Sequence, residues 1–222
     1  MYKSLAIVSI LAASISAAPV QSTHAKRQVA YVQYNGDGSA ADGWPTVDQW
    51  QSWDQLWSIN SPLMAQSCGW NGWGTDNSAQ ETSDVGSAIQ SVAGQNGLDE
   101  RFVLAIVMQE SKGCVRVPTT NNGIANPGLM QSHDGSGTCA GVDPCPTSEI
   151  YQMVTDGTAG TPSGDGLVQT VASTGESGAQ GMYAGARKYN SGSVDLQDLG
   201  QSFGSTASYA SDVANRVMGW AG

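Results

Sequence analysis

Residues 102–114 read FVLAIVMQESKGC, an almost continuous apolar run that closes on a carboxylate, Glu110, and its flanking turn. Val103, Ile106 and Val107 precede this acid by seven, four and three positions, which on a helix places all of them on its own face. The run therefore predicts a buried helix whose core-facing stripe carries an acid at its C-terminal end. A carboxylate in apolar surroundings is unfavourable unless it is protonated, paired or used in chemistry, so Glu110 is a candidate functional residue.

Two interpretations of Glu110 follow from this position. Desolvation and the negative end of the helix dipole both raise the pKa of a carboxyl group, so Glu110 can stay protonated near neutral pH and act as a general acid. Alternatively, it is a helix-end residue whose carboxylate turns to water or pairs with Lys112 or Arg116. The helix alone favours the second interpretation.

The first 27 residues carry two processing signals. Residues 1–18 begin with Lys3, continue as an apolar stretch and end in small residues, which is typical of a secretory signal peptide and too short for a membrane span. Residues 19–27 end in the dibasic pair Lys26-Arg27, which is typical of a propeptide cleavage site. We therefore expect a secreted, extracellular protein whose mature chain starts near Gln28.

Residues 28–222 are enough for a single domain with a sizeable core, and residues 28–45 predict an irregular arm because they are rich in Gly and Asp without periodicity. All 19 acidic residues lie in this domain together with six of the nine Lys and Arg, so its net charge is −13. Such a surface repels nucleic acid and anionic membranes, and we expect neither as a partner.

The cysteines number four, an even set in an exported chain, which favours two disulfides. The spacing of Cys68, Cys114, Cys139 and Cys145 leaves three connectivities open. No C-x-x-C pair exists and His133 is the one histidine of the mature chain, so we expect no metal and no other cofactor.

The rest of the domain predicts further helices. Residues 46–49 have the pattern of a capping box that opens a helix, on which Trp50, Trp53 and Trp57 would form one packing stripe. Period-two alternation is nearly absent, which indicates a mainly α-helical class. The other helices are expected at residues 83–97, 99–112, 147–156, 165–173, 178–189 and 207–219.

Two segments predict loops. Residues 69–78 carry Trp70 and Trp73 between glycines, where the rings either stack on sugars or, as we favour, anchor the loop to the core. Residues 119–146 are turn-rich and too long for an ordinary connection, and such segments are usually functional or pinned.

Three ordered blocks resemble the signature of the lysozyme-like superfamily, specifically goose-type lysozymes and soluble lytic transglycosylases. The chain reads Glu-Ser at residues 110–111, returns as Gly-Leu-Met-Gln at residues 128–131, and reads ARKYNSG at residues 186–192, similar to the Ala-x-x-Tyr-Asn-x-Gly segment of that group. The resemblance covers roughly residues 84–192.

The resemblance implies a lysozyme-like, mainly α-helical domain with a long central loop, and a groove in which the β-1,4 bonds of an aminosugar polymer are cleaved. It implies that Glu110 is the catalytic acid, which agrees with the need to protonate the glycosidic oxygen as its bond breaks. The residues that match substrate-facing positions are Ser111, Met130, Gln131, Tyr189 and Asn190.

The chain departs from this pattern after residue 131. Goose-type enzymes have an aspartate two positions after Gly-Leu-Met-Gln, where this chain has His133, and its aspartate, Asp134, comes one position later. A hydrolase needs a second group to hold water or stabilise charge, whereas a lytic transglycosylase uses the substrate's own hydroxyl. Asp134 is therefore either that second group or a loop residue capping its own Asp-Gly turn. His133 is expected to be a surface loop residue.

The substrate stays open at this stage. We expect a monomeric enzyme acting on a cell-wall polysaccharide, with peptidoglycan first. The same fold acting on chitosan, chitin or mannan is the alternative, since peptidoglycan walls are anionic and the chain is acidic. A non-catalytic extracellular sugar-binding or effector protein is the alternative from another class.

For the cysteines we predict the pairs Cys68–Cys114 and Cys139–Cys145. The second pair would be a local staple enclosing five residues, and the first would tie the end of the Glu110 helix to the tryptophan loop.

Overall fold

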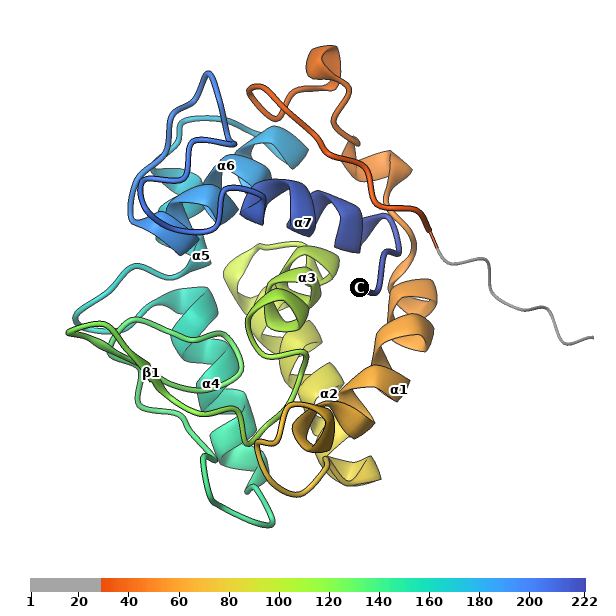
Figure 1. Cartoon of the computed structure of the whole chain (residues 1–222), viewed down its shortest axis with the longest axis vertical. Helices are drawn as coiled ribbons and strands as arrows, with labels where there is room; N and C mark the ends of the chain where they lie inside the picture. Colours follow the sequence, from red (N-terminus) through yellow and green to blue (C-terminus); the bar gives the residue numbers. More distant parts are fainter. Residues whose placement is uncertain (1–28) are drawn as a thin grey trace, which may run out of the picture.

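The computed structural model describes residues 29–222, so the signal peptide and propeptide expected at residues 1–27 lie outside the described residues. Within this range the chain is mainly helical, with one small pair of strands (Figure 1). The elements in chain order are α1 (Trp53–Trp70), α2 (Ala79–Asn96), α3 (Glu100–Glu110), β1 (Thr120–Asn121), β2 (Ala125–Asn126), α4 (Thr147–Ala159), α5 (Leu167–Ala172), α6 (Gly178–Ser191) and α7 (Tyr209–Val217).

Helix α3 is the centre of the fold, and Figure 1 shows it surrounded by the other helices. Its seven residues from Phe102 to Met108 are all buried, as the apolar run predicts. Asp99 caps its N-terminus by accepting a hydrogen bond from the amide of Arg101. The helix ends at Glu110, two residues earlier than predicted, because Lys112 has a φ of 54° and has left the helix.

The predicted helix at the first tryptophans is wrong in one respect. The capping box at Thr46 exists, but it opens only a short 3-10 helix, Val47–Gln49. The next residue, Trp50, is in extended conformation, and a second capping box at Ser52 opens α1. Trp50 therefore does not share a helix with the tryptophans of α1, and the single stripe predicted for the three rings does not form.

The loop after α1 is shorter than predicted. Helix α1 continues through Trp70, and α2 starts at Ala79 rather than at residue 83. Ser78 and Glu81 form a reciprocal capping box at the start of α2, in which each side chain accepts a hydrogen bond from the other residue's amide. The sequence contains this Ser-x-x-Glu pattern, and the helix that it opens starts four residues before the predicted start at residue 83.

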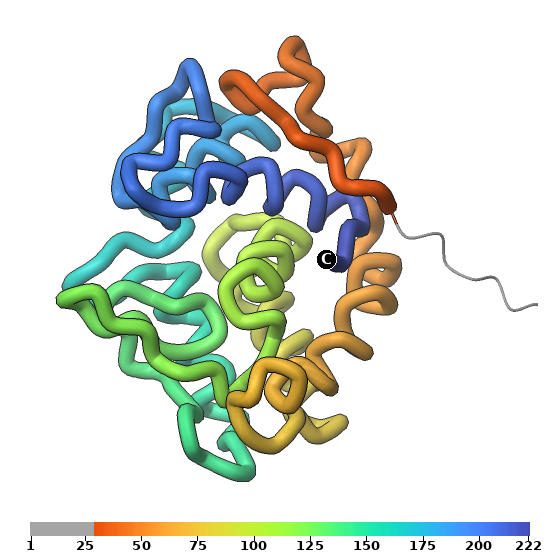
Figure 2. The backbone as a smooth tube through the Cα atoms, in the orientation of Figure 1, coloured from red at the N-terminus to blue at the C-terminus, as the bar shows by residue number. Residues whose placement is uncertain are grey.

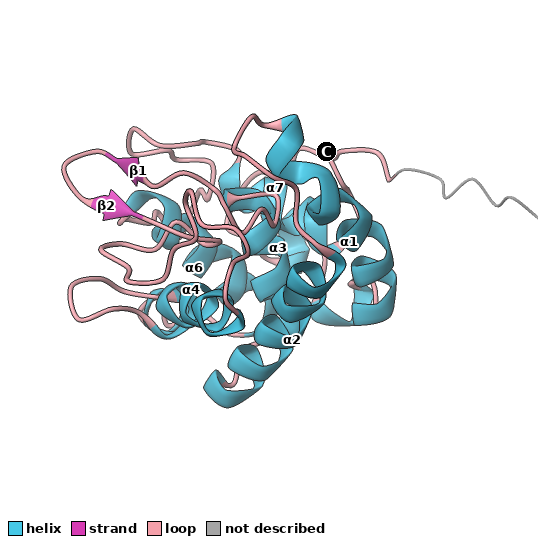
Figure 3. Ribbon diagram, turned by 90° about the horizontal axis from the view of Figure 1, so that it is seen from below, coloured by secondary structure: helices cyan, strands magenta, loops and turns pink. Residues whose placement is uncertain are grey.

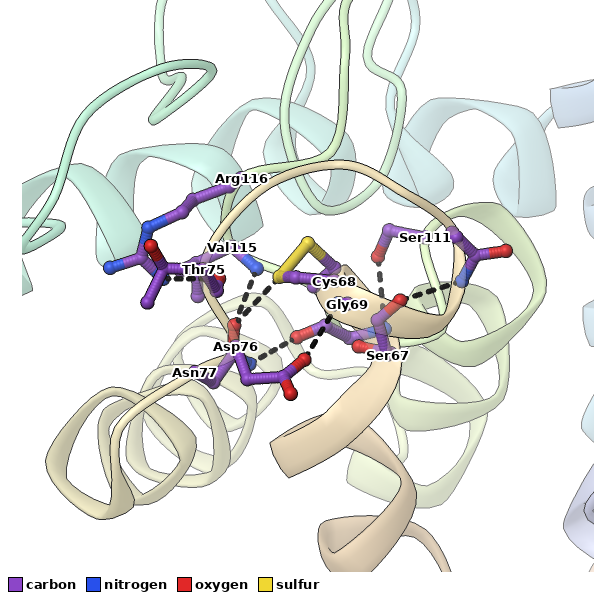
Figure 4. The surroundings of a disulfide bond; sticks show 12 residues. Ser67, Cys68, Gly69, Thr75, Asp76, Asn77, Ser111, Val115 and Arg116 are labelled. Atoms are coloured by element: carbon purple, nitrogen blue, oxygen red, sulfur yellow. Dashed lines mark hydrogen bonds between the residues drawn. A yellow bond between two sulfur atoms is a disulfide. The ribbon is translucent and has the colours of Figure 1, made fainter.

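Both predicted disulfides are confirmed, since Cys68 is bonded to Cys114 and Cys139 to Cys145. Figure 4 shows the first of them where α1 meets the turn after α3. Beside it, the Asn77 amide group donates to the carbonyl of Gly113 at 2.7 Å and accepts from the amide of Val115 at 3.1 Å. The disulfide and this asparagine together fix the end of α3 to the α1–α2 connection.

The long segment between α3 and α4 is pinned at several points. It contains the antiparallel strands β1 and β2, which sequence analysis did not predict and which project to one side in Figure 3. Arg116 binds the carboxylates of Glu81, at 2.6 Å, and Asp143, at 2.7 Å. Asp156 of α4 accepts hydrogen bonds from the amides of residues 136 and 137. These bonds hold a segment with little regular structure against α2 and α4.

The N-terminal arm packs along α7 (Figure 2). The Asn215 side chain accepts from the amide of Val32 at 2.8 Å and donates to its carbonyl at 2.7 Å. Further along, Trp44 is buried against Tyr183 of α6. Arm and helices thus share one core. No helix within residues 29–222 is both long enough and apolar enough to span a bilayer.

The two disulfides differ in the loop that they close, with sequence separations of 46 and 6. Removing Cys68–Cys114 by a double change to serine should lower the free energy of unfolding by about 4 kcal/mol, against about 2 kcal/mol for Cys139–Cys145, because the longer loop restricts the unfolded chain more. Urea unfolding of the two double variants measures the difference. An equal or larger loss from the Cys139–Cys145 variant would contradict it.

Candidate active site

Glu110 is half-buried at the last position of α3. The phenol of Tyr209, the first residue of α7, donates a hydrogen bond to its Oε1 atom. Burial raises the pKa of Glu110 to about 7, and the hydrogen bond from Tyr209 opposes this with a smaller effect. The carboxyl group is therefore largely protonated at mildly acidic pH.

Glu110 makes no ion pair with either of the cations that the sequence offered. Arg116 binds Glu81 and Asp143 instead. Lys112 points its ammonium group to the carbonyl oxygen of Gly222, at 3.2 Å. The alternative in which Glu110 pairs with Lys112 or Arg116 is therefore wrong, and desolvation is the main cause of its raised pKa.

Tyr209 is held in place by a buried arginine. The guanidinium of Arg187 lies 5.8 Å from the centroid of the Tyr209 ring and is fully buried. It donates to the carbonyl of Thr206 at 2.6 Å, to the hydroxyl of Ser205 at 2.7 Å and to the side-chain oxygen of Asn190. Burial also raises the pKa of Tyr209, followed by the charge of Glu110, so the phenol stays protonated and remains a donor.

A polar cleft of about 830 Å³ is lined by residues that include Tyr189 and Asn190 of α6. Five parts of the chain form it: the β1–β2 hairpin, the segment after it, the α4–α5 connection, helix α5 and the C-terminal end of α6. Its lining residues include Asn122, Ile124, Asn126, Gln131, His133, Thr161, Gly164, Asp165, Gln169, Lys188, Tyr189 and Asn190.

Tyr189 connects the cleft with Glu110. It lines the cleft, and its phenol donates a hydrogen bond to the carbonyl of Met130 at 2.8 Å. Its pKa is raised first by burial and then by the negative charge of Glu110, so the two side chains interact electrostatically. Tyr189 lines the cleft, whereas Glu110 does not.

Three of the five residues predicted to face the substrate do line the cleft: Gln131, Tyr189 and Asn190. Gln131 has a positive φ of 48°, and its side chain is fixed by hydrogen bonds with Thr120, at 2.8 Å, and with the carbonyl of Gly128, at 3.1 Å. Its amide is thereby oriented before any ligand binds.

Ser111 and Met130 have fully buried side chains instead. The Ser111 hydroxyl donates to the carbonyl of Val107 and accepts from the amide of Gly113, so it closes the end of α3. The Met130 side chain packs under Gly157, where a Cβ would lie 2.4 Å from it. Neither side chain is open to the cleft, which corrects the prediction that they face the substrate. The Met130 carbonyl accepts the hydrogen bond from Tyr189, and Ser111 follows Glu110 directly in the turn that it closes.

Asp134 and His133 lie on the rim of the site. Asp134 is exposed, has a φ of 51°, and is fixed through its amide, which donates to the carbonyl of Ala125 at 2.8 Å. His133 lines the cleft, whereas Asp134 is not among the lining residues. The acid that does line the cleft is Asp165. Sequence analysis did not single it out, because an acid at the start of a predicted helix is expected for helix stability alone.

Within residues 29–222 no three His, Cys, Asp or Glu side chains are grouped so that they could hold a metal ion. No protein-family model matches the chain, and no curated protein matches it.

The raised pKa of Glu110 makes the stability of the fold depend on pH. Because the folded pKa of about 7 lies above the ordinary value of 4.5, the stabilisation from protonated Glu110 is complete below about pH 4.5 and is lost as the pH rises through about 7. Glu110→Gln cannot ionise, so its stability relative to wild type should rise by roughly 3 kcal/mol between pH 4 and pH 8. Urea unfolding of both proteins at the two pH values measures this. A constant difference between them would show that the carboxyl group is not desolvated.

Proposed function

We propose that the protein is a secreted glycosidase that cleaves β-1,4 bonds of an aminosugar polymer, with peptidoglycan as the first candidate and Glu110 as the general acid. The observation that carries this proposal is Glu110 at the end of the buried run of α3, where burial raises its pKa to about 7 and where it interacts electrostatically with Tyr189, a residue that lines a polar cleft. A general acid works best when its pKa lies near the working pH.

The hydrogen bond from Tyr209 indicates which oxygen of Glu110 acts. Since Tyr209 donates to Oε1, this atom serves as the acceptor, and the proton of the neutral acid belongs on Oε2. In the proposed reaction Oε2 gives this proton to the glycosidic oxygen as the bond to the sugar breaks. Tyr209 then stabilises the carboxylate that remains, because its hydrogen bond favours the charged form.

The composition of the cleft supports a sugar polymer as the ligand. Amide side chains line it at Asn122, Asn126, Gln131, Gln169 and Asn190, and its charged members are Lys188 and Asp165. Amides donate and accept hydrogen bonds at once, which suits sugar hydroxyl and acetamido groups. The secreted localisation belongs to the same proposal, and the two disulfides are compatible with it.

Two alternative functions are compatible with the same fold or the same cleft. The net charge of −13 beyond residue 27 opposes binding to an anionic wall at low salt, which favours chitosan, chitin or mannan on the same fold. A sugar-binding protein without catalysis would use the same amide-lined cleft, and it is distinguished by a Glu110 that no activity requires.

Glu110→Gln tests the assignment. The amide retains the acceptor for Tyr209 but cannot donate the catalytic proton, so turnover of the best substrate should fall by roughly 10²–10⁴-fold. The matched control is Glu100→Gln, the same change at the other end of α3, which should leave turnover unchanged. Assays on purified peptidoglycan, chitin, chitosan and mannan measure both variants. Wild-type turnover by Glu110→Gln would refute the proposal.

The products separate hydrolysis from attack by the substrate's own hydroxyl. If Asp134 or Asp165 positions water, its change to Asn should lower turnover by roughly 10²-fold or more, and wild-type products should carry a normal reducing end. If the substrate's hydroxyl attacks, both variants should be nearly as active as wild type, and the products should lack one water as 1,6-anhydro sugars do. Mass spectrometry of the wild-type products decides between the two mechanisms.

A further inference from the structure

A second groove, of about 550 Å³, lies between α1 and α2 and shares no residue with the polar cleft. Figures 1 and 3 both place α1 on the opposite side of α3 from the β1–β2 hairpin, which borders the cleft. We propose that this groove, called here the α1–α2 groove, is an accessory binding site for a neutral stretch of glycan. The proposal rests on the proposed function in so far as that glycan is the polymer cleaved in the cleft.

Two tryptophans of α1 form the apolar part of the groove. The rings of Trp53 and Trp57 are parallel to within 11°, with their centroids 5.6 Å apart, and both side chains are half-buried. They belong to the groove lining, so part of their surface stays open. Flat indole surfaces bind the apolar C–H face of a pyranose ring while their N–H groups remain available for hydrogen bonds.

A glycine of α2 fixes the position of one ring. At Gly86 a Cβ would lie 2.7–3.1 Å from three atoms of the Trp57 ring, so the indole rests directly on the helix backbone. Glycine inside a helix lowers helix stability relative to alanine, so this close approach has a cost in helix stability. The ring is therefore held in place before any ligand binds.

A hydroxyl group in the groove lining has no partner. Thr82 is only 8% exposed, and its Oγ1 atom is buried without a hydrogen bond within residues 29–222. A buried polar group in this state destabilises the protein and gains from any partner that arrives. Threonine on a helix has two accessible χ1 rotamers, so this hydroxyl can turn toward a ligand hydroxyl.

The remaining lining favours a neutral, hydroxyl-rich ligand over a protein surface. It consists of small or hydroxyl residues and one amide, without a charged side chain: Ser61, Pro62, Ala65, Ala79, Ser83, Ser87 and Gln90. A second copy of this chain would bring a net charge of −13 with it and would be repelled at low salt, whereas an uncharged glycan is not.

An accessory site would act through local concentration. A glycan chain held in the α1–α2 groove keeps the protein on an insoluble polymer while the cleft on the other side works on neighbouring chains. Short soluble fragments cannot occupy both places, so their cleavage should not depend on the groove.

The test uses the Glu110→Gln protein, so that the polymer stays intact, and measures the bound fraction on insoluble chitin and on insoluble peptidoglycan. Trp57→Ala in that background should weaken binding to the preferred polymer by roughly tenfold. The matched control is Trp70→Ala, because Trp70 lies on the same helix, is 62% exposed and lines neither site. It should bind like the parent.

Thr82→Val is a second test variant, which keeps the proposal testable if Trp57→Ala has a folding defect. It removes only the unpartnered hydroxyl, so it should keep or raise the melting temperature while it weakens binding several-fold. Binding equal to the parent in both Trp57→Ala and Thr82→Val would overturn the proposal, as would an equal loss with Trp70→Ala.

The outcome is separable from that of the proposed function. With Glu110 restored, Trp57→Ala should cleave short soluble oligosaccharides like wild type and lose activity only on the insoluble polymer. Trp57-dependent binding by a protein that cleaves nothing would support the groove and refute the catalytic role. Loss of activity on soluble fragments as well would overturn the accessory site and leave Glu110's role intact.

Discussion

The constraint on which the structure depends is the burial of the middle of α3, from Phe102 to Met108. Seven consecutive residues of this helix are buried, so other elements must cover it on every side, and α1, α2 and α7 all contact it. Only the two ends of α3 approach the surface, and its C-terminal end carries Glu110. The burial that stabilises the helix is thus the same burial that desolvates the carboxyl group and raises its pKa.

The end of α3 is fixed from two directions. On one side Ser111, the Cys68–Cys114 bond and Asn77 join it to the α1–α2 connection. On the other side Tyr209 holds the carboxylate oxygen, and Arg187 holds Tyr209. A general acid must be oriented as well as protonated, and these contacts fix the residue by packing and hydrogen bonds from several elements.

Sequence reasoning was accurate where a local pattern decides the outcome. The apolar run over Phe102–Met108, the position of Glu110 at its end and both disulfides agree with the structure. The start of α1 was wrong because two capping boxes lie six residues apart and only packing selects the second. The β1–β2 hairpin was missed because two-residue strands have no periodicity to detect.

The parts of the site that come from distant segments could not be predicted. Tyr209 lies 99 residues after Glu110, and no pattern in either segment links them. Ser111 and Met130 were expected to face a ligand because they match residues of the resembling motifs, but a motif match does not give the direction of a side chain, and both are buried. Asp165 reaches the cleft only because the α4–α5 connection folds over it.

The contribution of α7 also sets an order of events during synthesis. Residues 29–191 include the core helix, both disulfides and most of the cleft, yet the phenol that meets Glu110 comes from residue 209. The arm at Val32, made early, finds its partner Asn215 only after the ribosome has added more than 180 further residues. A nascent chain can therefore form its disulfides before the phenol that binds Glu110 has been synthesised. The acid acquires its final environment last, when α7 docks.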